Sequence, residues 1–221
     1  MGSPSSLSAL SAVRVVAYNA HMGEMPSRLG LGLSLGIRHP KILQILLHHP
    51  LAPSTIFMIQ EAGELLALLA TRNARNHVVY HATGVGKPMG VLTLVPKTLV
   101  AEGAEVESLA FKNSPMRRQC HIVLVRGTAL VNAHLESCAD GAKVREQQVL
   151  EIGSAVQKLG RLRAKSYGYG VFGDLNGYHD QTGRRVSHLG YGIEVSRRPS
   201  ARFPSYSPHK LRTFYVRAGV S

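Results

Sequence analysis

Short apolar runs, most of them ending at a polar residue, dominate the hydrophobic pattern of this chain. Runs of this length that are rich in Val, Ile, Leu and Phe are typical of buried β-strands. They predict strands at 13–18, 55–60, 77–81, 90–95, 98–101, 104–109, 120–125, 130–133, 168–172 and 213–217.

Three other segments have apolar positions at helical intervals. Pro40 fits the first turn of a helix that runs to about residue 49, before Pro50 and Pro53 end it. Residues 62–72 and 141–165 show the same helical spacing. Strands and helices mixed in this way predict an α+β domain.

The chain is long enough for one domain with a substantial core, because it has 221 residues. We expect residues 1–12 to be a flexible lead and residues 13–221 to form a single domain. Residues 177–221 stand out as a basic tail of atypical composition, rich in Gly, Arg, Ser, Pro and His. No segment reaches the ~18 apolar residues of a membrane span, so no transmembrane segment is expected.

The net charge indicates the kind of partner, and the cysteines indicate the compartment. Lys and Arg number 26 against 13 Asp and Glu, which gives a formal net charge of +13. A field of that sign favours polyanionic partners, with DNA or RNA first among them. Cys120 and Cys138 match no zinc-site spacing, so we expect thiols in a reducing, intracellular compartment, with cytoplasm, nucleus and organelle left open.

Polar side chains follow several of the predicted strands at the point where each strand ends. They are Asn19, Glu61, His134, Asp174 and Asn176. Residues two apart in a strand project to the same side, so Asp174 and Asn176 offer a carboxylate and an amide to one small object. A hydrated metal ion or a phosphate oxygen fits that description, and the strand ends together predict one shared site.

Five segments carry a resemblance to a known family. They are Val16-Ala17-Tyr18-Asn19, Ile56-Phe57-Met58-Ile59-Gln60-Glu61, Gly90-Val91-Leu92-Thr93-Leu94, Asn132-Ala133-His134-Leu135-Glu136-Ser137 and Gly173-Asp174-Leu175-Asn176. In this order the chain resembles the endonuclease/exonuclease/phosphatase superfamily, the DNase I-like fold. The resemblance implies a four-layer α/β/β/α sandwich of two packed mixed β-sheets flanked by helices, here shortened at the C-terminus.

The resemblance also implies a role for each strand-end residue. Glu61 is the principal ligand of a metal ion, Mg²⁺ or alternatively Mn²⁺, and Asn19 assists the metal or a phosphate oxygen. Asp174 positions or deprotonates the attacking water, and Asn176 orients Asp174 and holds a phosphate oxygen. His134 donates a hydrogen bond to the scissile phosphate. Oxygen ligands suit Mg²⁺, and a cation stabilises the charge that develops on a phosphoryl group.

Simpler interpretations stay open for several of these residues. Asp174 also fits a turn ahead of Asn176-Gly177, and His134 alone fits a structural histidine. Arg117 and Arg118 precede a predicted strand and either contact substrate phosphates or form a solvated charge pair.

The end of the chain departs from the family pattern. The family closes with an Asp in a strand of the type Arg-Ile-Asp-Tyr and with a Ser-Asp-His. In one interpretation, which we favour at this point, Arg212-Thr213-Phe214-Tyr215 is the first of these elements without its Asp. In the other, Ser207-Pro208-His209 is the second, with Pro in place of Asp, and His209 contacts the phosphate. Either way the site looks incomplete, so a partner chain that completes it is also possible.

Two functional hypotheses follow. The first is a Mg²⁺-dependent phosphodiesterase or endonuclease acting on nucleic acid, and nicking nucleases, abasic-site or retroelement-type endonucleases and tyrosyl-DNA phosphodiesterases stay open within it. The second is a catalytically weakened family member that binds nucleic acid or belongs to a ribonucleoprotein. The arginines and aromatic residues interleaved along the tail favour this second hypothesis, because such a mixture clamps phosphates and stacks bases.

Overall fold

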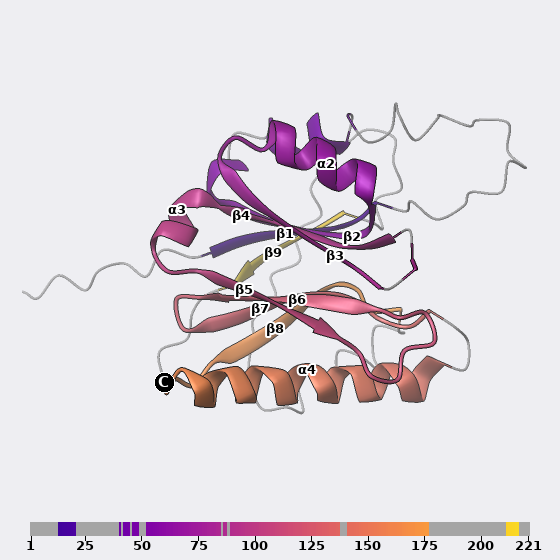
Figure 1. Ribbon diagram of the computed structural model, residues 1–221. Coiled ribbons are helices and arrows are strands. Elements are labelled where there is room, and N and C mark those ends of the chain that lie inside the picture. Colours follow the sequence, from indigo (N-terminus) through magenta and orange to yellow (C-terminus); the bar gives the residue numbers. More distant parts are fainter. Residues whose placement is uncertain are drawn as a thin grey trace, which may run out of the picture.

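The described part of the protein has four layers, two β-sheets packed face to face with helices outside each (Figure 1). The computed structural model describes residues 13–20, 40–48, 52–137 and 141–176, apart from 41, 45, 85 and 88, together with the backbone of 211–216. The strands are β1 (Val13–Asn19), β2 (Thr55–Gly63), β3 (His77–Thr83), β4 (Met89–Pro96), β5 (Glu105–Ala110), β6 (Gln119–Val125), β7 (Thr128–His134), β8 (Gly168–Asp174) and β9 (Leu211–Val216).

The strands described form two mixed sheets that confirm the expected architecture. The first has the order β3-β4-β2-β1-β9, and the second has the order β5-β6-β7-β8. Each sheet holds one parallel pair, β1 with β2 and β7 with β8, next to antiparallel neighbours. Within each parallel pair the carboxyl ends lie side by side, and the contact of Asn19 with Asp174 places both pairs of ends at the same end of the sandwich.

Helices cover the outer faces of both sheets (Figure 1). They are α2 (Glu64–Asn73) and α4 (Ala142–Leu162), with a 3₁₀ turn, η2 (Ala52–Ser54), and helical residues between 40 and 47. The short α3 (Lys97–Ala101) lies at one end of the sandwich and buries Leu99 in the core between the sheets. The residues around 40–47 and α2 bury Leu43 and Leu66 against the first sheet. On the other side α4 buries Ile152 and Val156 against the second sheet. None of the helices described is both long and apolar enough to cross a membrane.

The core between the sheets comes from the same apolar runs that predict the strands. Val15, Ile56, Met58 and Leu130 are fully buried there and pack with Phe172. Burial on both faces explains why β2 and β7 read as continuous apolar runs in the sequence rather than as alternating patterns.

One predicted strand is wrong. Residues 98–101 form the short helix α3, not a strand. Pro96 ends β4, since it has no N–H to donate to a ladder, and it stands at the N-cap of α3. Gly103, at a φ of +96°, then turns the chain into β5. A short apolar run cannot be assigned from periodicity alone, and the flanking Pro and Gly decide it here.

The structure describes one of the two cysteines. Cys120 is a buried free thiol in β6, and burial raises its pKa. Cys138 lies outside the described residues, so the expected reducing compartment stays a prediction.

Candidate functional site

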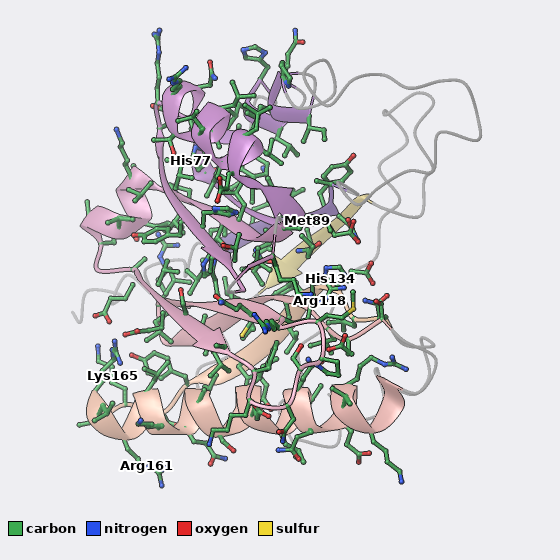
Figure 2. All side chains as sticks on the ribbon, turned by 45° about the vertical axis from the view of Figure 1, so that its right-hand side comes forward. His77, Met89, Arg118, His134, Arg161 and Lys165 are labelled. Carbon is green, nitrogen blue, oxygen red and sulfur yellow. The ribbon has the colours of Figure 1, made fainter. Side chains whose placement is uncertain are left out.

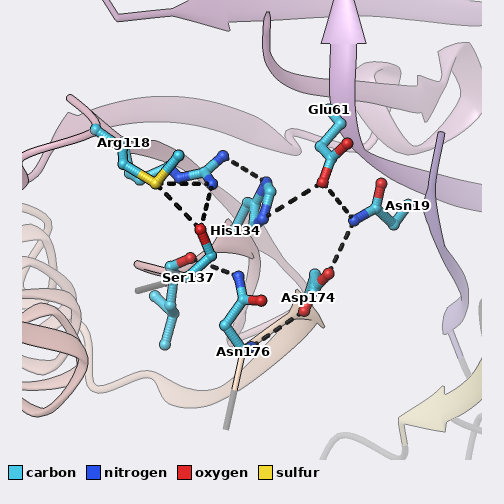
Figure 3. Close-up of polar contacts among 9 residues, drawn as sticks. Asn19, Glu61, Arg118, His134, Ser137, Asp174 and Asn176 are labelled. Carbon is cyan, nitrogen blue, oxygen red and sulfur yellow. Dashed lines mark hydrogen bonds and ion pairs between the residues drawn. The ribbon is translucent and has the colours of Figure 1, made fainter. Parts of the chain in front are cut away.

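Two carboxylates and one imidazole converge at the carboxyl ends of three strands. Glu61 comes from β2, His134 is the last residue of β7, and Asp174 is the last residue of β8. Their candidate ligand atoms lie within 4.8 Å of one another. Figure 3 shows these side chains pointing toward one another, although they arrive from different sheets.

Asn19 joins the two carboxylates. Its Nδ2 donates to Oε1 of Glu61 at 3.0 Å and to Oδ2 of Asp174 at 2.8 Å. Asn19 ends β1, which lies next to β2, so the pairing of these strands brings the amide to the acids. Two carboxylates held around one amide form an oxygen-rich set, which is the donor chemistry that Mg²⁺ prefers.

Local backbone geometry aims Glu61 into the cluster. The residue has a φ of +52°, in the left-handed region, and the register of β2 with β4 shifts between Gln60 and Ala62. A bulge of this kind redirects a side chain, and left-handed residues other than glycine are costly. The fold therefore holds Glu61 in an unfavourable conformation that places its carboxylate beside His134.

Asn176 fixes Asp174 from behind. Its backbone N–H donates to Oδ1 of Asp174 at 3.1 Å, and its Nδ2 donates to the carbonyl oxygen of Leu135 at 2.8 Å. Asn176 has a φ of +46°, which Asn tolerates better than most residues. The turn that the sequence allowed at this point is therefore present, and it holds the carboxylate in the cluster.

Arg118 reaches the cluster through His134 (Figures 2 and 3). Its Nη1 donates to Nδ1 of His134 at 2.7 Å, and its Nη2 lies 3.5 Å from Oγ of Ser137. A guanidinium only donates, so Nδ1 must accept and the ring proton of neutral His134 sits on Nε2. That Nε2 lies 3.8 Å from Oε1 of Glu61, which is too long for a hydrogen bond. His134 is thus arranged as a donor into the cluster and not as a metal ligand.

Burial keeps His134 neutral. Loss of solvation, together with the neighbouring Arg118 cation and against the opposing charges of Asp174 and Glu61, lowers the pKa of His134 to about 4. The imidazole therefore holds a single proton at neutral pH and presents it from Nε2.

Other predicted residues lie elsewhere. Arg117 turns toward the β3–β4 loop, where its Nη1 lies 3.9 Å from the position of a β-carbon on Gly86. Its own backbone has a φ of +53°. His209 lies outside the described residues. The structure thus brings Asn19, Glu61, Arg118, His134 and Asp174 together, with Asn176 behind them.

The register of β9 bears on the two interpretations of the C-terminal segment. Phe214, where the first one expects the missing Asp, pairs with Val15, four residues before Asn19 on β1. At about 3.3 Å per residue along a strand, the place of Phe214 beside Val15 is roughly 13 Å from Asn19. Leu211 pairs with Tyr18, so β9 begins beside the end of β1 that carries Asn19. The register therefore favours the second interpretation, in which Ser207-Pro208-His209 precedes this strand.

Sequence reasoning missed Ser137 and the partners of Glu136. Ser137 contacts Arg118 and also Sδ of Met116, at 3.1 Å. Buried Glu136 accepts from Oγ of Ser114 at 2.8 Å, and this contact anchors the loop before Arg118. The available signal was their position two and three residues after His134, but their partners Ser114, Met116 and Arg118 come from another loop.

Two further buried histidines, His77 and His121, make stability depend on pH. Burial lowers the pKa of His77, and burial with nearby His81 lowers the pKa of His121 to about 4. The unfolded chain, with a pKa near 6.5, then binds protons that the folded protein does not, so stability falls as pH drops from about 6.5 toward 4. Between pH 7.5 and 5 we expect His121 alone to cost about 2 kcal/mol. Urea unfolding across this range measures the loss, and His121→Gln should reduce it; an unchanged pH dependence in that variant would contradict the assignment.

Comparisons with known proteins identify the fold. No family model and no curated protein sequence matches the chain. Solved structures do match. An endonuclease/exonuclease/phosphatase family protein from Bacteroides thetaiotaomicron superposes with a TM-score of 0.61 at 16% identity, over 93% of this chain and 83% of that one. The chain has the endonuclease/exonuclease/phosphatase fold.

Two structures of TDP2 share this fold. The D. rerio protein complexed with a single-strand DNA product gives a TM-score of 0.59 at 16% identity, over 94% of this chain and 85% of that chain. A truncated Caenorhabditis elegans TDP2 gives a TM-score of 0.57 at 20% identity, over 93% of this chain and 84% of that chain. The DNase I-like fold expected from the sequence is thus confirmed, and these identities support similarity of fold alone.

Proposed function

We propose that the protein is a metal-dependent phosphodiesterase that hydrolyses phosphodiester bonds in nucleic acid. The observation that carries this proposal is the convergence of Glu61, His134 and Asp174 within 4.8 Å, with Asn19 bridging the two acids. The net charge of +13 favours a polyanionic substrate over a small neutral ester. A DNA product in a TDP2 of the same fold adds to this support.

The donor set suits a divalent cation. Glu61 and Asp174 would hold Mg²⁺ or Mn²⁺ through carboxylate oxygens. Asn19 would add its side-chain oxygen only with the amide turned around, since Nδ2 faces both acids here. Such a cation would neutralise charge on the phosphoryl oxygens of the substrate. His134 is excluded from this set, because the lone pair on its Nδ1 accepts a hydrogen bond from Arg118 and its Nε2, which faces the acids, carries the proton.

The residues of the chain divide the remaining work. Asp174, held by Asn176, would orient and accept a proton from the attacking water. His134 would donate its Nε2 proton as a hydrogen bond to a phosphate oxygen, and Arg118 would keep that proton in place while adding positive charge. We further propose that His209 contacts the same phosphate, because it precedes β9 by two residues.

A substrate panel tests the proposal. The purified chain is incubated with Mg²⁺ or Mn²⁺ and with three substrates: supercoiled plasmid, a duplex holding one abasic site, and a 5′-tyrosyl oligonucleotide. We expect cleavage of at least one that stops in EDTA and returns with added metal. Salt-sensitive binding without any cleavage would contradict the proposal and favour the alternative, a catalytically weakened nucleic-acid-binding protein.

A further inference from the structure

A buried chain of polar side chains crosses between the two sheets directly beneath the cluster. Its members come from four strands and are at most 1% exposed: Gln60 on β2, Thr93 on β4, His121 on β6 and Asn132 on β7. Polar groups at this depth are costly unless each finds a partner, so their contacts need to be traced one by one.

The orientations of the two amides, Gln60 and Asn132, are fixed by their hydrogen bonds. Nε2 of Gln60 donates to the carbonyl oxygen of Met58 at 3.0 Å and to Oδ1 of Asn132 at 2.7 Å. Nδ2 of Asn132 donates to the carbonyl oxygen of Leu92 at 3.0 Å and to Oγ1 of Thr93 at 2.9 Å. Carbonyl oxygens only accept, so neither amide can be turned around.

The last link joins Thr93 to His121, whose Nδ1 lies 2.9 Å from Oγ1 of Thr93. That hydroxyl has one hydrogen and two lone pairs, so it accepts from Asn132 whether it donates to Nδ1 or accepts from it. The chain therefore has one direction from Gln60 through Asn132 to Thr93, and turning either amide would set its oxygen against a carbonyl oxygen.

Gln60 touches or adjoins every strand end that carries a site residue. It immediately precedes Glu61 on β2, and its partner Asn132 stands two residues before His134 on β7. It also packs against β8, since a β-carbon on Gly173 would lie 2.8 Å from its Nε2. Gly173, at a φ of +127°, directly precedes Asp174. One amide thus contacts or adjoins all three strands that supply the cluster.

We propose that Gln60 is the positioning residue of this site. Its side-chain amide sets the spacing of Glu61, His134 and Asp174 by holding β2, β7 and β8 at their carboxyl ends. This inference rests on the proposed function for its catalytic meaning. Partners that orient metal-binding groups from behind typically contribute about 10–100-fold to metal affinity or activity.

A purely structural role would also explain a buried link between sheets. Both roles predict a loss of stability when Gln60 is replaced, so stability alone does not separate them. The two roles differ in what happens to the cluster in molecules that stay folded. The experiment therefore compares Gln60→Leu, which keeps a bulky side chain and removes the amide, with Ile56→Ala.

Ile56 is a suitable control because it is also fully buried on β2, four residues before Gln60 and outside the polar chain. Three quantities are measured for the wild type and both variants: the Kd for Mn²⁺ by electron paramagnetic resonance, kcat and KM for cleavage, and the ring ¹⁵N chemical shifts of His134. Thermal unfolding confirms that each sample is folded under the assay conditions.

We expect Gln60→Leu to weaken Mn²⁺ binding or lower kcat by about 10–100-fold and to move the His134 ring resonances. Ile56→Ala should lower thermal stability and leave all three quantities near wild type. Equal behaviour of the two variants would overturn the proposal. If the wild type neither binds Mn²⁺ nor cleaves any substrate, the proposed function fails, and the His134 resonances still decide whether Gln60 positions the cluster.

Discussion

Asp174→Asn is expected to lower kcat for phosphodiester cleavage by about 10²–10⁴-fold while the protein stays folded. The new amide is nearly the same shape, and its oxygen still accepts from the backbone N–H of Asn176. It has lost the charge that would orient and deprotonate a water molecule. With its oxygen turned to Asn176, the new amide sets its NH₂ group against Nδ2 of Asn19, so the hydrogen bond between residues 19 and 174 is lost. Steady-state cleavage of the substrate found active in the panel measures the effect.

Glu102→Gln is the matched control for this change. It removes one negative charge, as Asp174→Asn does, but Glu102 lies at the surface, directly after α3, where it pairs with Arg126. A general change in the electrostatic field of this basic protein would affect both variants alike. Retained activity in Asp174→Asn would show that Asp174 has no part in the chemistry.

Glu61→Gln should act on the metal rather than on the water. We expect the Kd for Mn²⁺ to rise by at least about 100-fold, because even groups behind the direct ligands contribute about 10–100-fold. The left-handed backbone at Glu61 exists in the folded protein independently of the charge, so the amide should occupy the same place. Calorimetric titration measures the affinity, and cleavage across a range of Mg²⁺ concentrations should recover in part at high metal.

The control here is Glu64→Gln, three residues further along at the start of α2, where the side chain is exposed. Its metal affinity should equal that of the wild type. An unchanged Kd in Glu61→Gln would mean that the metal, if bound, is held by other residues. Loss of activity in Glu61→Gln without loss of metal binding would move Glu61 from ligand to acid–base group.

The strands and their polar ends could be predicted because both follow from local rules. Residues buried on two faces must form continuous apolar runs, and polar groups appear where the burial stops. Asn19, Glu61, His134 and Asp174 were found in this way, before any distance was known. The helix at 97–101 was missed because its apolar content is the same in either conformation, and the Pro and Gly beside it carry the difference.

The contacts that shape the site could not be predicted, since they depend on the pairing of strands within a sheet and on the packing of one sheet against the other. Arg118 meets His134 across the β6–β7 pair, and Gln60 meets Asn132 across the gap between the two sheets. Nothing in the local sequence of either partner encodes the other. The place of the last strand was equally hidden, and only its pairing with β1 shows that Leu211 lies beside Tyr18.

The pairing of β1 with β9 also constrains how the protein is made. Val13 pairs with Val216, so the strand that carries Asn19 gains this neighbour only after all the strands of the second sheet have been synthesised. Contacts this far apart in sequence form late, because a long loop must close before they gain any energy. The edge of β1 beside Asn19 therefore stays open until β9 pairs with it, although Asn19, Glu61, His134 and Asp174 all precede β9 in the sequence.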